Sequence, residues 1–208
     1  MTIVHSIRGE FVRYKALAEG AIRQVPDAQL ATPAGDTGNS IAVIAWHVAG
    51  NLRSRFTDFL TTDGEKPWRH RDEEFTARTV PRDALLARWN EGWDALLAAL
   101  DGLTDAQLTG TVTIRGQGFL VHEALHRALA HVSYHVGQIV YIGKALRGPA
   151  WQYLSIPPGQ SEAYNQQPKN EKPAAHARAI GSATRTENRE PGIENPNRTG
   201  NQNTNREP

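Results

Sequence analysis

The stretch LVHEALHRALAHVSYHVGQIVYIGKAL, residues 120–146, decides the fold class and contains four of the eight histidines. Its strongly apolar residues recur at helical spacing and define one buried face, formed by Leu125, Ala128, Val132, Val136 and Ile139. Gly148-Pro149 follows directly, and this pair is typical of a helix end. We therefore predict a long amphipathic helix here, with one face turned toward a core.

Three upstream segments show the same periodicity, at about residues 3–25, 40–60 and 81–100. Asn39 or Ser40 can cap the second segment, and Pro81 suits the first turn of the third. The link between them, residues 61–80, is long for adjacent antiparallel helices, so we expect it to cross an end or side of a bundle. The predicted class is all-α, a four-helix bundle with a long crossover between helices 2 and 3.

Two shorter segments flank the predicted last helix. Residues 111–114, Thr-Val-Thr-Ile, suit a short strand or an extended loop, and the RGQGF segment after them reads as a glycine-rich turn. Composition then changes near Tyr164, because residues 165–208 contain no aromatic residue, no Leu and no Val. Such a segment cannot bury enough apolar surface to offset its ordering entropy. We predict a bundle domain over residues 1–164 and a disordered tail over 165–208.

Overall composition excludes several classes of function. The formal net charge of +1 gives no electrostatic reason to bind nucleic acid or an anionic membrane. No apolar run approaches the roughly 20 residues that span a bilayer, and the first residues do not resemble a signal peptide. The chain has no cysteine, so it supplies neither disulfides nor a thiol nucleophile. We expect a cytoplasmic protein with no nucleic-acid or membrane partner.

The four clustered histidines form two pairs that face different ways. His131 and His135, four residues apart, lie beside the apolar stripe of the predicted helix. His122 and His126 lie on its far margin, and Glu123 points away from the core. The H-E-x-x-H pattern is also found in zinc proteases, but there the glutamate must stand beside the metal in a cleft. We therefore interpret His122, Glu123 and His126 as surface residues and the second pair as candidate metal ligands.

His47 is the candidate for a third ligand. It lies in the apolar segment IAVIAWHVAGNLRSRF of the predicted second helix, so we expect it to be at least half buried. Two imidazoles four residues apart and one from a facing helix would make a three-nitrogen site with open positions for water or substrate. The alternative on spacing alone is three separate core histidines, each hydrogen-bonded to its neighbours.

Other polar residues are predicted to lie near this site. Asn51 and Arg55 follow His47 on nearly the same helical face, and Arg55 can bind a substrate carboxylate or pair with an acidic residue of the crossover. Arg127 precedes His131 by one turn, and Gln138 is a candidate hydrogen-bond partner behind a ligand. We take these four as candidate substrate-binding or supporting residues.

The crossover TTDGEKPWRHRDEEF is rich in charged and aromatic residues. One interpretation is a lid over the metal, with Glu65, Asp72 or Glu73 as an acid or base. The other is a structural clamp held by ion pairs.

Two long segments carry a resemblance to a known superfamily. IAVIAWHVAGNLRSRFTDFLTTDGEKPWRHRDEEF and ALAHVSYHVGQIVYIGKAL resemble the DinB/YfiT-like superfamily of metalloenzymes, more closely one branch of small bacterial proteins of unassigned function. The similarity covers about residues 3–160. It implies a four-helix bundle, often dimeric, and a metal triad at His47, His131 and His135. It also implies a divalent ion, zinc, nickel or manganese, and assigns no role to His122 or His126.

The resemblance also implies a range of reactions. Characterised relatives include transferases and isomerases that use low-molecular-weight thiols, so such a thiol is a candidate cosubstrate. A bound ion would stabilise a thiolate or hydroxide at neutral pH. We expect a metal-dependent thiol S-transferase or hydrolase acting on a small molecule, and a homodimer. The alternative is a non-catalytic, metal-binding, dimerising protein related to stress.

Overall fold

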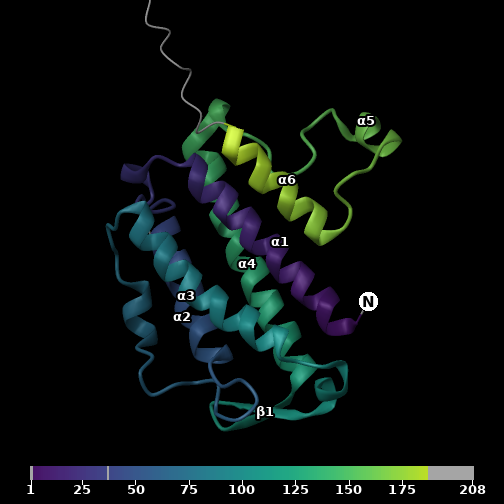
Figure 1. Cartoon of the computed structure of the whole chain (residues 1–208). Helices are drawn as coiled ribbons and strands as arrows, with labels where there is room; N and C mark the ends of the chain where they lie inside the picture. The colour runs from purple at the N-terminus through teal and green to yellow at the C-terminus, as the bar shows by residue number, and fades with distance from the viewer. Residues whose placement is uncertain (1, 37, 187–208) are drawn as a thin grey trace, which may run out of the picture.

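Four long helices form the body of the protein in the computed structural model, which describes residues 2–36 and 38–186 (Figure 1). They are α1 (Ile3–Gln24), α2 (Ile41–Phe56), α3 (Arg82–Asp101) and α4 (Val121–Arg147). α2 packs against α3, α1 packs against α4, and α2 also contacts α4. The predicted four-helix bundle is confirmed. Short 3₁₀ helices occupy Asp27–Gln29, Arg71–Phe75, Asp105–Thr109 and Gly148–Ala150.

Apolar side chains from all four helices fill the bundle interior. Phe11, Leu52 and Leu125 are completely buried, and so are Trp89 and Trp93, one turn apart on α3. The ring of Phe11 meets that of Trp93 edge-on, with 6.4 Å between the ring centroids. Each such side chain contributes roughly 1.5–3 kcal/mol when it leaves water. The core therefore gives α2 and α4 a rigid framework for the side chains that they share.

Gly92 lets α3 approach the backbone of α2 closely. A Cβ atom at this position would lie 2.4 Å from the carbonyl oxygen of Ala49 and 2.7 Å from its Cα atom. These are backbone atoms that cannot move aside without shifting a helix. Since Ala49 is two residues after His47, this contact also sets the position of the candidate ligand.

The crossover from α2 to α3 runs along α2. It begins earlier than expected, because α2 ends at Phe56 and Asp58 has a φ of +50°. The 3₁₀ helix Arg71–Phe75 in its second half packs against α2. The crossover therefore covers the helix that carries His47 instead of passing freely through solvent.

A small β-hairpin precedes α4 and receives the first part of the crossover. β1 (Thr111–Ile114) pairs antiparallel with β2 (Gln117–Leu120), and the turn residues Arg115 and Gly116 have φ values of +56° and +72°. The first strand agrees with one of the two predicted readings. The second, Gln-Gly-Phe-Leu, was not predicted, because it lacks the β-branched residues that favour strands.

Asp63 joins the crossover to the hairpin. Its carboxylate accepts hydrogen bonds from the backbone N–H groups of Glu65 (2.7 Å), Arg115 (2.8 Å) and Gly116 (2.7 Å). These bonds lower the pKa of Asp63 to about 2. The bond from Glu65 has the largest effect and the bond from Gly116 the next largest. The N–H of Gly64 also donates to the carbonyl of Thr113 at 2.8 Å. The crossover is thus anchored at the hairpin end of the bundle.

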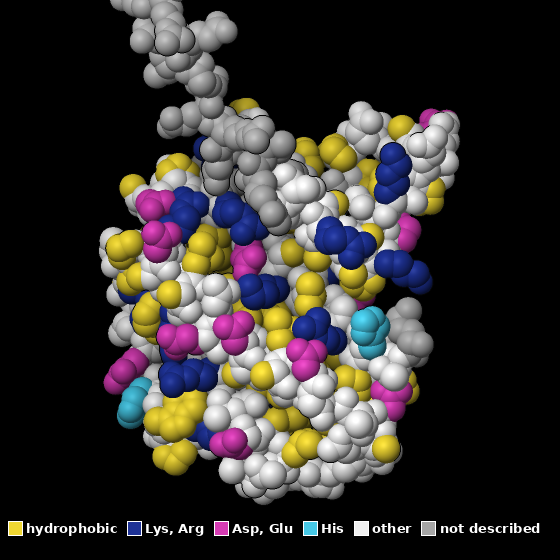
Figure 2. All heavy atoms as spheres, in the orientation of Figure 1, with side chains coloured by type: hydrophobic (Ala, Val, Ile, Leu, Met, Phe, Trp, Pro, Cys, Tyr) yellow, Lys and Arg dark blue, Asp and Glu magenta, His cyan; other side chains and the backbone are white. Residues whose placement is uncertain are grey.

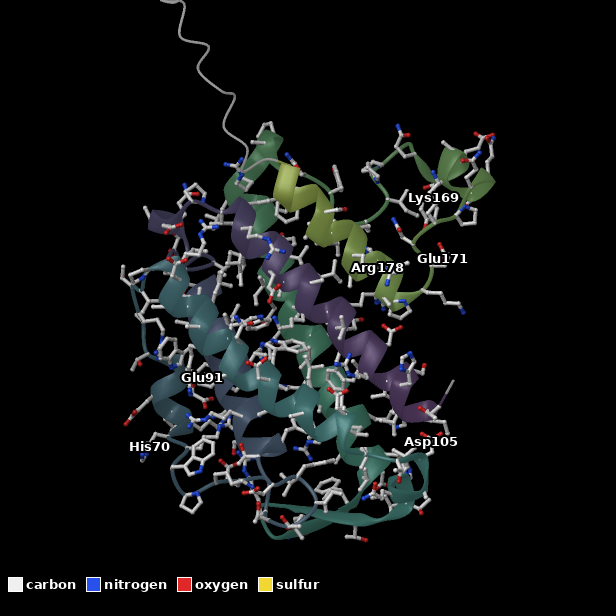
Figure 3. The ribbon with its side chains drawn as sticks, in the orientation of Figure 1. His70, Glu91, Asp105, Lys169, Glu171 and Arg178 are labelled. Carbon is white, nitrogen blue, oxygen red and sulfur yellow. The ribbon has the colours of Figure 1, made fainter. Side chains whose placement is uncertain are left out.

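The start of α1 is held by an acidic residue from the other half of the chain. Asp105, labelled beside the first turn of α1 in Figure 3, accepts from the N–H groups of Ile3 and Val4, both at 2.9 Å. A carboxylate is favourable here because the first N–H groups of a helix have no partners within the helix. Ser40 caps α2 in a similar way, through a 3.2 Å bond from the N–H of Val43.

Part of the segment predicted to be a disordered tail, residues 165–208, is helical in the structure. α5 (Ser161–Gln166) spans the predicted boundary, and α6 (Pro173–Thr186) lies along α1 (Figure 1). Ile180 is buried over Gly20, where a Cβ atom would come within 2.8 Å of the Ile180 side chain. The overall composition of residues 165–208 does not indicate this helix. It depends on a short Ala-rich amphipathic stretch whose buried residue is Ile180. Residues 187–208 lie outside the described residues.

The surface shown in Figure 2 carries basic and acidic side chains intermixed, with apolar side chains between them. Among the described residues, no helix is both long enough and apolar enough to cross a membrane.

Candidate metal centre

Three histidines from two helices meet at one point. His47 comes from α2, and His131 and His135 come from successive turns of α4. One ring nitrogen from each can be chosen so that all three lie within 4.8 Å of one another. The Nε2 atoms of His47 and His131 are 3.2 Å apart. The structure thus brings together the three predicted ligands, because a spacing of four residues on α4 points both imidazoles toward α2.

Hydrogen bonds at Nδ1 orient two of these rings. The Nδ1–H of His47 donates to Oε2 of Glu74 at 2.8 Å, and the Nδ1–H of His135 donates to Oε1 of Gln138 at 2.8 Å. Each ring then has its Nε2 free of that partner and available as a ligand atom. Partners behind a ligating histidine usually set its tautomer and orientation in this way.

Burial favours the neutral form of His131 and His135. Burial is the largest cause, and together with the nearby His135, His47, Arg69 and Arg55 it lowers the pKa of His131 to about 3. Burial also lowers the pKa of His135, and its bond to Gln138 offsets only part of that effect. Both rings are therefore free bases at neutral pH, as metal binding requires.

The donor set fits a divalent transition-metal ion. A tetrahedral ion with metal–nitrogen bonds of about 2.0–2.1 Å holds two ligand nitrogens about 3.3 Å apart. The 3.2 Å between the Nε2 atoms of His47 and His131 agrees with that separation. Imidazole nitrogen suits zinc and nickel well, whereas manganese prefers oxygen ligands. His47, His131 and His135 can hold such an ion and leave positions open.

Glu74 links the metal centre to the crossover, and sequence reasoning missed it. Its carboxylate is buried, and it accepts from Arg69 through two guanidinium nitrogens (2.9 and 2.8 Å) as well as from His47. Burial raises the pKa of Glu74, but the hydrogen bonds from Arg69 and His47 outweigh burial and bring it below its ordinary value. Glu74 is therefore an ionised acceptor behind His47.

The Glu74 carboxylate sits against α2 at Gly50. A Cβ atom at Gly50 would lie 2.1 Å from Oε1 of Glu74, so glycine makes the room for it. The ring of Phe75, the next residue, stacks near His47 with 4.4 Å between centroids. The only sequence signal for this contact was a glycine one turn after His47.

The acidic residues named earlier for the crossover have other roles. Glu65 pairs with Arg55 (3.1 Å) and Arg115 (2.9 Å), and the side chains of Asp72 and Glu73 are exposed. The ion pairs of Glu65 and Glu74 favour the clamp interpretation of this segment over a lid with free acids.

A cavity of about 210 Å³ adjoins the histidines. Its wall includes His47 and His131, and also Asn51, Arg55 and Arg127. Three of the four candidate supporting residues thus line this cavity, and the fourth, Gln138, contacts His135 from behind. Arg55 donates to the carbonyl of Gly64 and to Glu65, so the acidic partner expected for it lies in the crossover.

The residues of the H-E-x-x-H pattern lie outside the three-histidine cluster, and two of them form hydrogen bonds near the start of α4. Nδ1 of His122 bonds the carbonyl of Leu108 at 3.0 Å, and Oε2 of Glu123 accepts from the N–H of Leu120 at 2.8 Å, at the start of α4. His126 is exposed. Within the described part of the chain, the one His/Asp/Glu group that meets metal-site geometry is the His47 cluster.

Comparison with known protein families gives a match over most of the chain. A family model matches residues 1–160, from α1 to just before α5. The chain belongs to DUF1572. The description of this family is "protein of unknown function". No curated protein matches the chain. All three clustered histidines and Glu74 lie within the DUF1572 match, and α6 lies beyond it.

Replacing Glu74 with glutamine tests its role in this DUF1572 protein. We expect zinc affinity to fall by about 10- to 100-fold, because His47 loses its anionic partner. Competition with a chromophoric chelator measures the affinity. Glu73→Gln is the matched control, since its side chain is exposed and does not contact His47. Equal zinc affinity in the two variants would contradict a positioning role for Glu74.

Proposed function

We propose that this protein is a DinB-like, metal-dependent enzyme whose three histidines bind one divalent ion, zinc or nickel. The observation that carries the proposal is the convergence of three imidazoles beside a cavity, with two of them held by partners on their Nδ1 atoms. The resemblance of the two His-bearing segments to the DinB/YfiT-like superfamily supports it further.

A divalent ion held by the three histidines would lower the pKa of a water molecule or thiol bound at its open coordination position. The protein's own residues supply the rest. Glu74 and Gln138 orient two ligands, and the bundle core holds α2 and α4 at a fixed separation. Apolar side chains of Phe56, Phe59 and Ile114 form part of the cavity wall and keep water from that side of a bound substrate.

The reaction that we propose is attack by a small nucleophile on an electrophilic substrate. In an S-transferase, a low-molecular-weight thiol releases its proton to solvent and its sulfur forms a bond to a carbon atom of the substrate. The bond between that carbon and the leaving group breaks, and the leaving group departs with the electron pair. In a hydrolase, water takes the place of the thiol. Because the chain has no cysteine, the sulfur must come from a cosubstrate.

Turnover measurements test this proposal. Metal-free and zinc- or nickel-loaded protein are compared with cysteine plus chlorodinitrobenzene and, separately, with a nitrophenyl ester. We expect a metal-dependent rate above the uncatalysed reaction for one of the two pairs. His131→Ala should remove this rate and His126→Ala should keep it, because His126 is exposed and outside the cluster. Loaded protein without turnover of either pair would favour the non-catalytic alternative.

A further inference from the structure

Five arginines line the cavity beside the three histidines. Arg55 comes from α2, Arg69 and Arg71 from the crossover, Arg115 from the hairpin turn, and Arg127 from α4. The lining contains no Asp or Glu. Elements distant in sequence thus converge with the same charge on one small space.

Neighbouring acids neutralise most, but not all, of this charge. Glu65 is shared by Arg55 (3.1 Å), Arg115 (2.9 Å) and Arg69 (3.8 Å). Of the remaining acids, Glu74 pairs with Arg69, Asp72 lies 3.5 Å from Arg71, and Asp63 faces backbone N–H groups of the hairpin turn. Five arginines against four acids leave an excess of one positive charge, and a divalent ion would raise it to three.

Arg69 and Arg127 have guanidinium donors without an acceptor among the described residues. Nη1 of Arg69 is buried without a hydrogen-bond partner, in a side chain that is 2% exposed, and its nearest carboxylate oxygen is 3.8 Å away on Glu65. Arg127 forms no ion pair within the described residues, and its guanidinium lies 5.4 Å from the ring centroid of Phe119. Arg127 is exposed, whereas the unpartnered N–H of Arg69 is buried. A buried guanidinium N–H without a partner is unfavourable, and an oxyanion is its best acceptor.

The electrostatics of Arg55 agree with this surplus. Burial lowers its pKa, Glu65 counteracts that effect, and Arg69 and Arg115 lower the pKa further. The net pKa lies below the ordinary value, with burial as the largest cause and the two neighbouring arginines as smaller ones.

We propose that the cavity binds the carboxylate or phosphate group of an acidic small molecule, held by Arg69 and Arg127. A guanidinium can bind either group through two parallel hydrogen bonds. The apolar wall of Phe56, Phe59 and Ile114 receives the organic part of the same molecule. That this molecule is the substrate rests on the proposed function, because His47 and His131 line the same cavity.

The test uses full-length, metal-free protein, so that direct binding of an anion to a metal ion does not contribute. Calorimetry measures binding of inorganic phosphate and of succinate, with sodium chloride at equal ionic strength and neutral succinamide as references. We expect phosphate or succinate to bind and the references not to bind. Binding of phosphate alone indicates a phosphorylated substrate, and binding of succinate alone indicates a carboxylic acid.

Arg127→Gln should weaken this binding by about 10- to 100-fold, as expected for the loss of a charged hydrogen-bond donor. Arg147→Gln on the same helix removes the same charge away from the cavity and should leave affinity unchanged. Equal losses in the two variants, or binding no stronger than that of chloride, would overturn the proposal. A failure of anion binding leaves metal-dependent turnover untouched, and a failure of turnover leaves anion binding untouched.

Discussion

The His131→Ala variant is expected to lose nearly all bound zinc, whereas the wild-type protein should retain about one ion per chain after reconstitution and dialysis. His131 is the ligand whose Nε2 stands 3.2 Å from that of His47, and its ring also lies 4.6 Å from that of His135 between centroids. Its removal leaves two imidazoles. Loss of a partner behind a ligand typically lowers affinity by about 10- to 100-fold, and the loss of a direct ligand should exceed that range.

Metal content by mass spectrometry, with protein quantified on the same samples, measures this effect. His126→Ala is the matched control, because it removes an exposed histidine from the same helix. Circular dichroism of both variants confirms that the bundle is intact. Full occupancy in both variants would refute the triad and point back to His122 and Glu123. No zinc in the wild type, even after reconstitution, would refute the metal centre itself.

Gly92→Ala is expected to lower the free energy of unfolding by up to about 2 kcal/mol. The added Cβ atom would stand 2.4 Å from the Ala49 carbonyl oxygen, so α2 and α3 must separate. Overpacking of a rigid contact costs about 1–3 kcal/mol or more, and the better helix propensity of alanine returns at most about 1 kcal/mol. For a protein of this size, a loss of 2 kcal/mol corresponds to roughly 4–8 °C in Tm.

Gly137→Ala is the control for this prediction. Gly137 lies within α4, and a Cβ atom there would meet nothing within 4 Å. The same substitution should therefore leave stability unchanged or raise it by up to about 1 kcal/mol. Urea denaturation of the metal-free proteins measures both values. Similar stabilities for the two variants would show that α2 and α3 are not held together at Gly92.

The sequence was sufficient for the bundle and for the cluster of three histidines because both depend on helical periodicity. The four-residue spacing of His131 and His135, beside an apolar stripe, places both rings on the side of α4 that faces the bundle. His47 could be chosen as the partner because its own segment is apolar on most sides. Local rules of this kind apply before any tertiary contact is known.

The crossover did not follow such rules. Its sequence offers several acids in a row, and nothing in their order shows that Glu74, rather than Asp72 or Glu73, turns inward. That choice depends on the space that Gly50 leaves on α2 and on the guanidinium of Arg69. Which acidic residue turns inward is decided by the packing of the crossover against α2. It cannot be predicted from the composition or periodicity of either segment alone.

Two structural elements also required tertiary contacts. β2 has weak strand propensity, and it is paired with β1 across a turn whose two residues both have positive φ. α6 has little apolar surface of its own, and it packs on α1 where Gly20 admits Ile180. Each element is stabilised by a surface that the rest of the chain provides.

The sequence alone determined the helices, their inward faces and the three histidines, because a period of 3.6 residues directs side chains locally. Only the tertiary structure decided which groups bond the Nδ1 atoms of those histidines and which groups line the cavity beside them. Glu74 behind His47, and the arginines gathered around one cavity, come from segments far apart in the chain. Their meeting depends on close packing between helices and loops, and that packing exists only in the folded protein.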